Sequence, residues 1–289
     1  MILITGASGT VGKAVLQEVA KSGAKHRAMY RSAVEATKAP PGTETVIADF
    51  AKTETLAAAL RGVKSVYLVC SPIPDLVQLE SNMIDACVEA GVKHVVLNSA
   101  MGAGDWNKSF PVWHRQVEDK LKGTELSHTI LRPNSFHQNV VAFYAPTVRT
   151  QGAFYSSMQN ARNSFIDVRD IAAVAAKALG GEEHAGKTYE LNGPEALDYT
   201  TLAVKISKVA GRDVKYVDIS MEAQKKALLE QGMPDWLVKA LLELQEYYLA
   251  GNGVQTDDLS QRLLGRAPIT MDQFLAENSG EFRGQAAKA

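Results

Sequence analysis

A glycine-rich motif opens the chain, in the stretch MILITGASGTVG. The apolar run from Ile2 to Ile4 predicts a short strand, and the pattern of valines after it predicts a helix. Between the two lie three glycines spaced three residues apart, Gly6, Gly9 and Gly12. A strand, a glycine triplet and a helix in this order are typical of a dinucleotide-binding turn, although a tight turn without a ligand stays open as an alternative.

Each glycine has a distinct expected role. Gly6 permits a tight turn off the strand, Gly9 lets backbone N–H groups approach a pyrophosphate, and Gly12 lets the helix pack close to the strand. The N-terminus of that helix supplies partial positive charge. The residues predicted to hold a dinucleotide in this turn are Thr5, Gly6, Ser8, Gly9, Thr10, Val11 and Gly12.

Strand-like and helical patterns alternate along the first half of the chain. Further strands are predicted at 25–30, 44–48, 65–70, 94–97 and 127–131, and a helix at 75–90. This spacing implies parallel strands with right-handed crossovers. We therefore predict an α/β fold built on a doubly wound, parallel Rossmann sheet.

The expected division of the chain follows from a change of composition after Arg132. Residues 1–150 are predicted to form the NAD(P)-binding Rossmann domain, with a strand and a helix near 165–180 returning to it. Residues 151–289 are predicted to be mainly the substrate-side subdomain. The small-residue tail, 284–289, is expected to be frayed.

Composition argues against several classes of function. Lys and Arg total 31 against 32 Asp and Glu, so no basic face for nucleic acid is expected. With two cysteines, no CxxC and six scattered histidines, neither a disulfide framework nor a metal site is expected, and a reducing cytoplasm is the expected location. The opening apolar run is too short for a signal peptide, and no membrane span is expected. Monomer and homodimer both stay open.

The end of the second expected strand indicates which dinucleotide binds. A site for NAD places a carboxylate about 20 residues beyond the glycines. Here the strand ends instead in Arg31 and Ser32. Arg31 has the fork geometry to hold a 2′-phosphate, and Ser32 adds a hydrogen bond, which favours NADP(H) over NAD(H). A solvated surface arginine is the alternative.

Two more strand ends are expected at the same pocket. Asp49 and Phe50 close the third strand, where a carboxylate accepts from the adenine amine and a ring packs nearby; helix capping by Asp49 is equally compatible. Cys70, Ser71 and Pro72 close the fourth strand beside the expected ribose, with Cys70 interpreted as a small core residue and not a reactive thiol.

These features, with two later motifs, resemble the NmrA-like branch of the atypical short-chain dehydrogenase/reductases. The later motifs are TILRPN at 129–134 and FIDVRDIA at 165–172. The resemblance spans nearly the whole chain. It implies a doubly wound Rossmann sheet with a smaller, mostly helical C-terminal subdomain for the substrate, and NADP(H) between the two. Members of the family include quinone reductases, triphenylmethane-dye reductases, isoflavone-type reductases and non-catalytic redox-sensing regulators.

One departure from most short-chain dehydrogenases decides the expected chemistry. None of the nine tyrosines has a lysine four residues later, so the Tyr-x-x-x-Lys pair is absent. The corresponding stretch places Phe110 at the usual tyrosine and His114 at the usual lysine. A general acid typically contributes roughly 10²- to 10⁴-fold, so an enzyme without one favours acceptors that need little help, such as quinones and cationic dyes.

The expected activity is therefore NAD(P)H-dependent hydride delivery to a planar, conjugated small molecule. The alternative is a non-catalytic, NADP(H)-binding regulator of the NmrA type, which predicts the same glycines and Arg31. A sugar epimerase is disfavoured because it also uses the missing pair.

Candidate residues around the reacting atoms come from strand ends and from the resemblance. Catalytic candidates are Ser99, His114 and Asn134, which with Asn98 are also predicted to contact the cofactor. The alternatives that stay open are capping of a loop for Ser99, a structural role for His114 and Asn134, and core packing for each aromatic. The predicted substrate pocket comprises Met101, Phe110, Trp113, Phe136 and Asn139.

Overall fold

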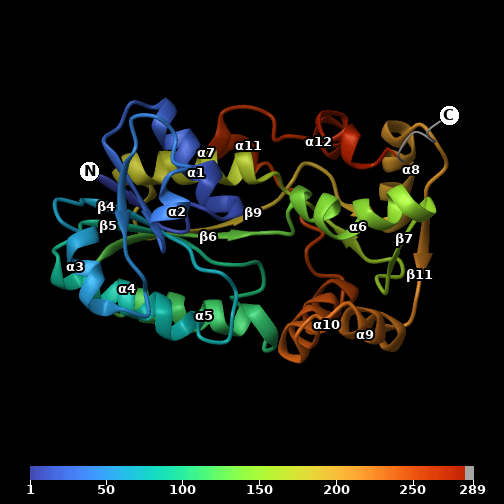
Figure 1. Cartoon of the computed structure of the whole chain (residues 1–289), viewed down its shortest axis with the longest axis horizontal. Helices are drawn as coiled ribbons and strands as arrows, with labels where there is room; N and C mark the ends of the chain where they lie inside the picture. Colours follow the sequence, from blue (N-terminus) through green and yellow to red (C-terminus); the bar gives the residue numbers. More distant parts are fainter. Residues whose placement is uncertain (284–289) are drawn as a thin grey trace. The chain divides into compact units, whose positions relative to one another are not determined.

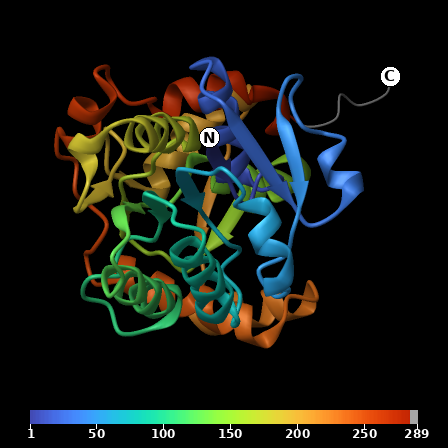
Figure 2. The same cartoon turned by 90° about the vertical axis from the view of Figure 1, so that its left-hand side faces the viewer.

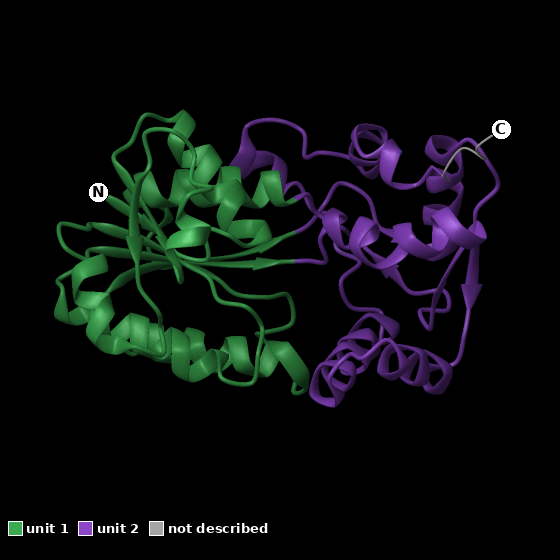
Figure 3. Cartoon of the chain, in the orientation of Figure 1, with its two compact units in different colours: residues 1–133, 168–191 green, residues 134–167, 192–289 purple. Residues whose placement is uncertain are grey.

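The computed structural model describes residues 1–283, and the tail predicted to be frayed lies outside this range. The described chain divides into two compact units, shown in green and purple in Figure 3. Among the described residues, unit 1 comprises 1–133 and 168–191, and unit 2 comprises 134–167 and 192–283. Among the described residues, every helix is too short or too polar to span a bilayer.

Unit 1 is built on a seven-stranded, fully parallel sheet with strand order β3-β2-β1-β4-β5-β6-β9. The strands are β1 (Ile2–Ile4), β2 (His26–Tyr30), β3 (Glu44–Ile47), β4 (Ser65–Leu68), β5 (His94–Asn98), β6 (Ser127–Pro133) and β9 (Lys187–Leu191). The order reverses between β1 and β4, which makes their carboxyl ends the switch point of a doubly wound sheet. The predicted fold class is confirmed.

Helices cover both faces of this sheet (Figures 1 and 2). On one face lie α1 (Thr10–Lys21) and α7 (Val168–Gly180), which pack against each other. On the other lie α3 (Leu56–Ala59), α4 (Leu76–Glu89) and α5 (Ser109–Lys122). The remaining helical segments of unit 1 are α2 (Ala33–Ala36), η1 (Thr53–Thr55) and η2 (Glu182–His184).

The core of unit 1 explains why these segments are apolar. Val66, Leu68, Val95 and Leu97 of the central strands are fully buried. They form one cluster with the inner side chains of α4 and α5, which include Met83, Ile84, Val117 and Leu121. Burial of such side chains contributes about 1.5–3 kcal/mol each, which fixes the helices on the sheet.

Unit 2 is mostly helical, with two short two-stranded sheets. Its helical segments are α6 (His137–Gln151), α8 (Tyr199–Ala210), α9 (Met221–Glu230), α10 (Asp235–Leu249), α11 (Leu259–Leu264), α12 (Met271–Glu277) and η3 (Ser279–Glu281). Its strands pair as β7 (Ala153–Ser156) with β11 (Lys215–Asp218), and β8 (Arg162–Asn163) with β10 (Leu197–Asp198). An aromatic core that includes Tyr144, Phe154 and Tyr199 holds α6 and α8 to these strands.

Candidate functional site

The turn between β1 and α1 requires glycine at two positions. Gly6 has φ +56°, in the left-handed region, and a Cβ atom there would lie 2.7 Å from Cγ1 of Val69. A Cβ atom on Gly12 would lie 2.2 Å from the carbonyl oxygen of Gly6. Helix and turn are therefore in direct backbone contact, which is the close approach that the sequence pattern predicted.

The N-terminus of α1 is open to an anion. Gly9 caps the helix, no side chain bonds the first backbone N–H groups, and the first turn carries no acidic residue. Gly6, Ser8, Gly9 and Thr10 are exposed at this end. Free N–H groups and the helix dipole together favour a pyrophosphate here.

Thr5 holds the turn in place. Its hydroxyl is buried, donates to the carbonyl oxygen of Tyr67 at 2.9 Å and accepts from the amide of Val69 at 2.9 Å. These bonds tie β1 to β4 at the switch point. The Thr5 side chain therefore shapes the loop, while the exposed residues after it are the ones available to a ligand.

Residues at the ends of β2, β3 and β4 are close enough to interact electrostatically. Burial, with a smaller contribution from Glu80, raises the pKa of the Cys70 thiol to about 12; Arg31 lowers this pKa slightly and Asp49 raises it slightly. The Arg31 side chain is exposed and has no ion-pair partner within residues 1–283. An unpaired guanidinium at the end of β2, the strand that pairs with β1, is suited to a phosphate.

Two other predicted nucleotide contacts already have local bonds. The Ser32 hydroxyl accepts from the amide of Glu35 at 3.2 Å and so caps α2. Oδ1 of Asp49 accepts from the amide of Ala51 at 3.0 Å, as in an Asx turn, and does not cap the following helix. Both side chains keep further lone pairs for a ligand.

A buried carboxylate organises the end of β5. Glu118, on α5, is fully buried and receives the Ser99 hydroxyl at 2.6 Å. Arg132 of β6 binds it in a bidentate manner, with N–O distances of 2.8 and 2.6 Å. Burial opposes ionisation of Glu118, but the bonds from Arg132, Ser99 and Lys122 outweigh it and hold the pKa of this carboxyl below its usual value.

Asn98 is also engaged within the sheet. Its Oδ1 accepts from the Tyr67 hydroxyl at 3.0 Å, and its Nδ2 donates to the carbonyl oxygen of Ser99 at 3.3 Å. One N–H of the amide is left for a ligand. The predicted role of Asn98 as a cofactor contact therefore rests on that single donor.

His114 lies one helical turn before Glu118 and is buried. Burial lowers the pKa of its imidazole to about 4, against a smaller opposing effect of Glu118. Its Nδ1 has no hydrogen-bond partner within the described chain. Beside it, Phe110 and Trp113 pack edge to face, with ring centroids 5.4 Å apart, and Met101 is buried nearby in sequence on the β5–α5 loop. An imidazole that is neutral at pH 7 has no imidazolium proton to give to an acceptor.

The predicted residues of unit 2 lie at the start of α6. Nδ2 of Asn134 donates to Oδ1 of Asn192 and to the carbonyl oxygen of Gly253, both at 2.9 Å, and its Oδ1 accepts from the amide of Ser135. Phe136 immediately precedes the helix, and Asn139 bonds Ser135 at 3.4 Å. Asn134 is thus a structural link of unit 2 in this geometry.

Sequence reasoning missed Glu118 and Glu80. Glu118 stands four residues after His114 and therefore shares a face of α5 with it. This spacing is the one sequence signal that could have indicated its burial. Glu80 of α4 is fully buried, and neither carboxyl oxygen has a hydrogen-bond partner in residues 1–283. Burial raises its pKa to about 8, with the backbone amide of Cys70 close enough to oppose this slightly.

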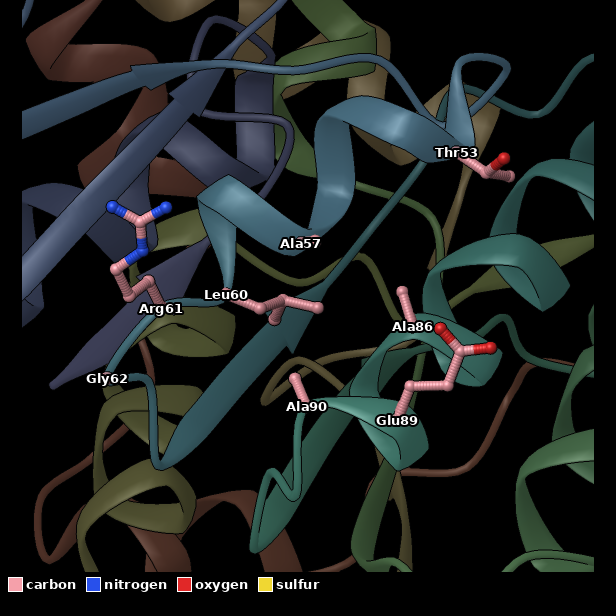
Figure 4. A pocket seen from close by; sticks show the side chains of 8 residues that line it. All are labelled: Thr53, Ala57, Leu60, Arg61, Gly62, Ala86, Glu89 and Ala90. Carbon is pink, nitrogen blue, oxygen red and sulfur yellow. The ribbon is translucent and has the colours of Figure 1, made fainter.

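A surface pocket of about 440 Å³ lies elsewhere in unit 1 (Figure 4). Its lining residues are Thr53, Ala57, Leu60, Arg61, Gly62, Ala86, Glu89 and Ala90. The pocket lies between α3 and α4, and several of its residues precede the starts of β4 and β5. None of them is a predicted site residue. It is therefore separate from the site at the carboxyl edge.

The reversed strand order, the glycine turn and the open helix end define a dinucleotide-binding protein of the Rossmann class. Comparison with known proteins agrees: the model of the NmrA-like family matches residues 1–275. The chain belongs to the NmrA-like family, as its motifs predicted.

Individual relatives align with the chain over nearly its whole length. It is 34% identical over 288 residues to the NAD(P)H azoreductase of Xenophilus azovorans, covering 98% of this chain and 99% of that protein. It is 28% identical over 280 residues to quinone oxidoreductase 2 of Escherichia coli, covering 96% and 98%. A solved NADPH-dependent quinone oxidoreductase of Escherichia coli, in complex with NADPH, matches with a TM-score of 0.88 and 28% identity, covering 97% and 99%.

Proposed function

We propose that the chain is an NAD(P)H-dependent oxidoreductase that delivers hydride to a conjugated acceptor, such as a quinone or an azo compound. Two relatives that align with nearly the whole chain are named as an NAD(P)H azoreductase and a quinone oxidoreductase. These comparisons confirm the oxidoreductase predicted from the sequence. They do not favour the alternative of a non-catalytic regulator.

The cofactor that we propose is NADP(H), in preference to NAD(H). The open N-terminus of α1 is suited to the diphosphate, and the unpaired Arg31 to a 2′-phosphate. When bound, the reduced nicotinamide supplies the hydride. The further contacts that we propose are Ser8, Thr10, Val11, Ser32, Asp49, Phe50, Cys70, Ser71, Pro72, Asn98, Ser99, His114 and Asn134, with Thr5 and the three glycines shaping the turn.

The observation that carries the reaction type is the absence of an available proton donor at the end of β5 in the described structure. The pKa of His114 is lowered to about 4 by burial, Phe110 has no polar group, and the Ser99 hydroxyl donates its hydrogen bond to Glu118. Quinones accept a hydride and become phenolates, which water protonates later. The chain's residues then position the reactants and exclude water.

The acceptor is a planar small molecule, and the side chains that we propose to contact it are mainly aromatic. In unit 1 these are Met101, Phe110 and Trp113, and in unit 2 Phe136 and Asn139. Aromatic rings offer stacking surfaces for a flat, conjugated molecule.

NADPH consumption against a panel of acceptors tests this function. The panel contains a quinone, an azo dye, a triphenylmethane dye and a simple ketone, with NADH in parallel. We expect turnover with the conjugated acceptors and none with the ketone. Turnover with the ketone alone would contradict the proposal, and tight NADPH binding without any turnover would favour a regulator.

A further inference from the structure

Both backbone polar groups of Ser99 already have a hydrogen-bond partner. Its amide donates to the carbonyl oxygen of Leu131 at 2.7 Å, and its carbonyl oxygen accepts from Nδ2 of Asn98 at 3.3 Å. The hydroxyl is the only polar group of the Ser99 side chain, and the residue is 2% exposed in the described structure.

The direction of the Ser99 hydroxyl is fixed by Glu118. A serine hydroxyl has one proton and two lone pairs, whereas a carboxylate only accepts. Glu118 is held as a carboxylate by Arg132, at 2.8 and 2.6 Å, and by Lys122 at 3.1 Å. The 2.6 Å bond from Ser99 to Glu118 therefore uses the only Ser99 proton, and the hydroxyl offers lone pairs alone to any ligand.

The order of strands places the nicotinamide half of the cofactor near Ser99. Arg31 follows β2, on one side of β1, and Ser99 follows β5, on the other side. A dinucleotide that crosses the switch point with its adenosine half over β2 and β3 has its nicotinamide half over β4 and β5. The nicotinamide ring carries one hydrogen-bond donor, its carboxamide N–H₂. Quinones and azo groups, in contrast, offer only acceptors.

We propose that Glu118 is a positioning residue that fixes Ser99 as a hydrogen-bond acceptor, and that Ser99 recognises the carboxamide N–H of the nicotinamide. Ser99 consequently gives no hydrogen bond to the oxygen or nitrogen of the electron acceptor. This inference rests on the proposed NADP(H)-dependent function and specifies what Ser99 does in it.

The test compares NADPH with its reduced 3-acetylpyridine analogue, in which a methyl ketone replaces the carboxamide. Binding of both is measured to the wild type, Ser99→Ala, Glu118→Gln and Asp119→Asn. Asp119 lies next to Glu118 on α5 but is exposed, so it provides the matched control. We expect Ser99→Ala and Glu118→Gln to weaken NADPH binding by about 3- to 10-fold, as expected for one hydrogen bond, and to leave the analogue unchanged.

The ratio of the two dissociation constants is the decisive readout, because a merely structural defect would weaken both nucleotides alike. Equal weakening of both in Ser99→Ala, or no weakening of either, would overturn the inference. Ser99→Ala leaves the bonds between Glu118 and Arg132 in place, so it decides the question even where Glu118→Gln does not fold. Failure of the wild type to bind either nucleotide would instead refute the proposed function itself.

Discussion

Gly12 packs against Gly6 so closely that a Cβ atom at position 12 would lie 2.2 Å from the Gly6 carbonyl oxygen. The first turn of α1 and the loop before it are therefore a single backbone unit. This contact places the free N–H groups of α1 at the carboxyl end of β1, where the sheet order reverses.

Gly12→Ala is expected to destabilise the protein by about 1–3 kcal/mol, because the added methyl group forces backbone atoms apart. NADPH binding should fall with it, since the loop moves. Urea unfolding and nucleotide titration measure the two effects. Gly180→Ala on α7 is the control, because a Cβ atom there meets nothing within 4 Å. Equal stability of Gly12→Ala and Gly180→Ala would show that the close contact between Gly12 and Gly6 does not require glycine at position 12.

Arg31→Ala is expected to weaken NADPH binding by roughly 10- to 100-fold, the usual effect of losing a charged hydrogen bond. NADH has no 2′-phosphate, so its affinity should stay the same. Titration of both nucleotides gives the comparison. Arg61→Ala is the control, because Arg61 is an exposed arginine that lines the surface pocket between α3 and α4. A parallel loss of affinity for both nucleotides would contradict the assignment of Arg31.

Glu80→Gln is expected to stabilise the protein increasingly as pH rises. The pKa of Glu80 is raised from 4.5 to about 8 by burial, so folding favours the protonated form. The contribution of protonated Glu80 to the free energy of unfolding is fully present below pH 4.5 and is lost progressively as pH rises to 8. For the wild type, this contribution should fall by about 3 kcal/mol between pH 4 and pH 7.

Unfolding measured at pH 5, 7 and 8.5 checks the Glu80 prediction, because the neutral amide of the variant does not titrate. Glu89→Gln, an exposed position on the same helix, serves as the control. A difference between wild type and Glu80→Gln that does not change with pH would show that the carboxyl is not protonated in the folded state.

His114→Gln is expected to reduce the loss of stability in acid. Burial lowers the pKa of His114 to about 4, so as pH falls the imidazole is protonated in the unfolded chain before it is protonated in the folded protein. The stability associated with neutral His114 is present above pH 6.5 and declines by about 3 kcal/mol down to pH 4. Unfolding at pH 7 and pH 4.5 measures the change, with half-buried His26→Gln as the control. Identical acid sensitivity of wild type and His114→Gln would refute this.

The fold follows largely from local signals in the sequence. Strands β1 and β5 and the long helix α4 end within two residues of their predicted bounds, because apolar runs and terminal glycines mark them. Helix α6 was not predicted: it contains Pro146 and a polar N-terminal turn, both of which disfavour a helix in isolation. Its buried face supplies the stabilisation that the local sequence lacks.

The site was predictable only where a backbone pattern defines it. The glycines and Arg31 are marked by their distance from an expected strand. Glu118 is not, because its charge is stabilised by Arg132, fourteen residues later, and by Ser99, nineteen residues earlier. Only the pairing of β5 with β6 and the packing of α5 bring these three residues together.

The central claim is that hydride passes to a conjugated acceptor without a proton from the protein. The most direct measurement is the isotope effect on kcat/KM for a cationic triphenylmethane dye, using NADPH deuterated at C4 of the nicotinamide and, separately, D₂O as solvent. The account predicts a primary effect from deuterated NADPH, deuterium in the reduced dye, and no effect of D₂O. A solvent isotope effect that disappears in His114→Gln or Ser99→Ala would contradict it.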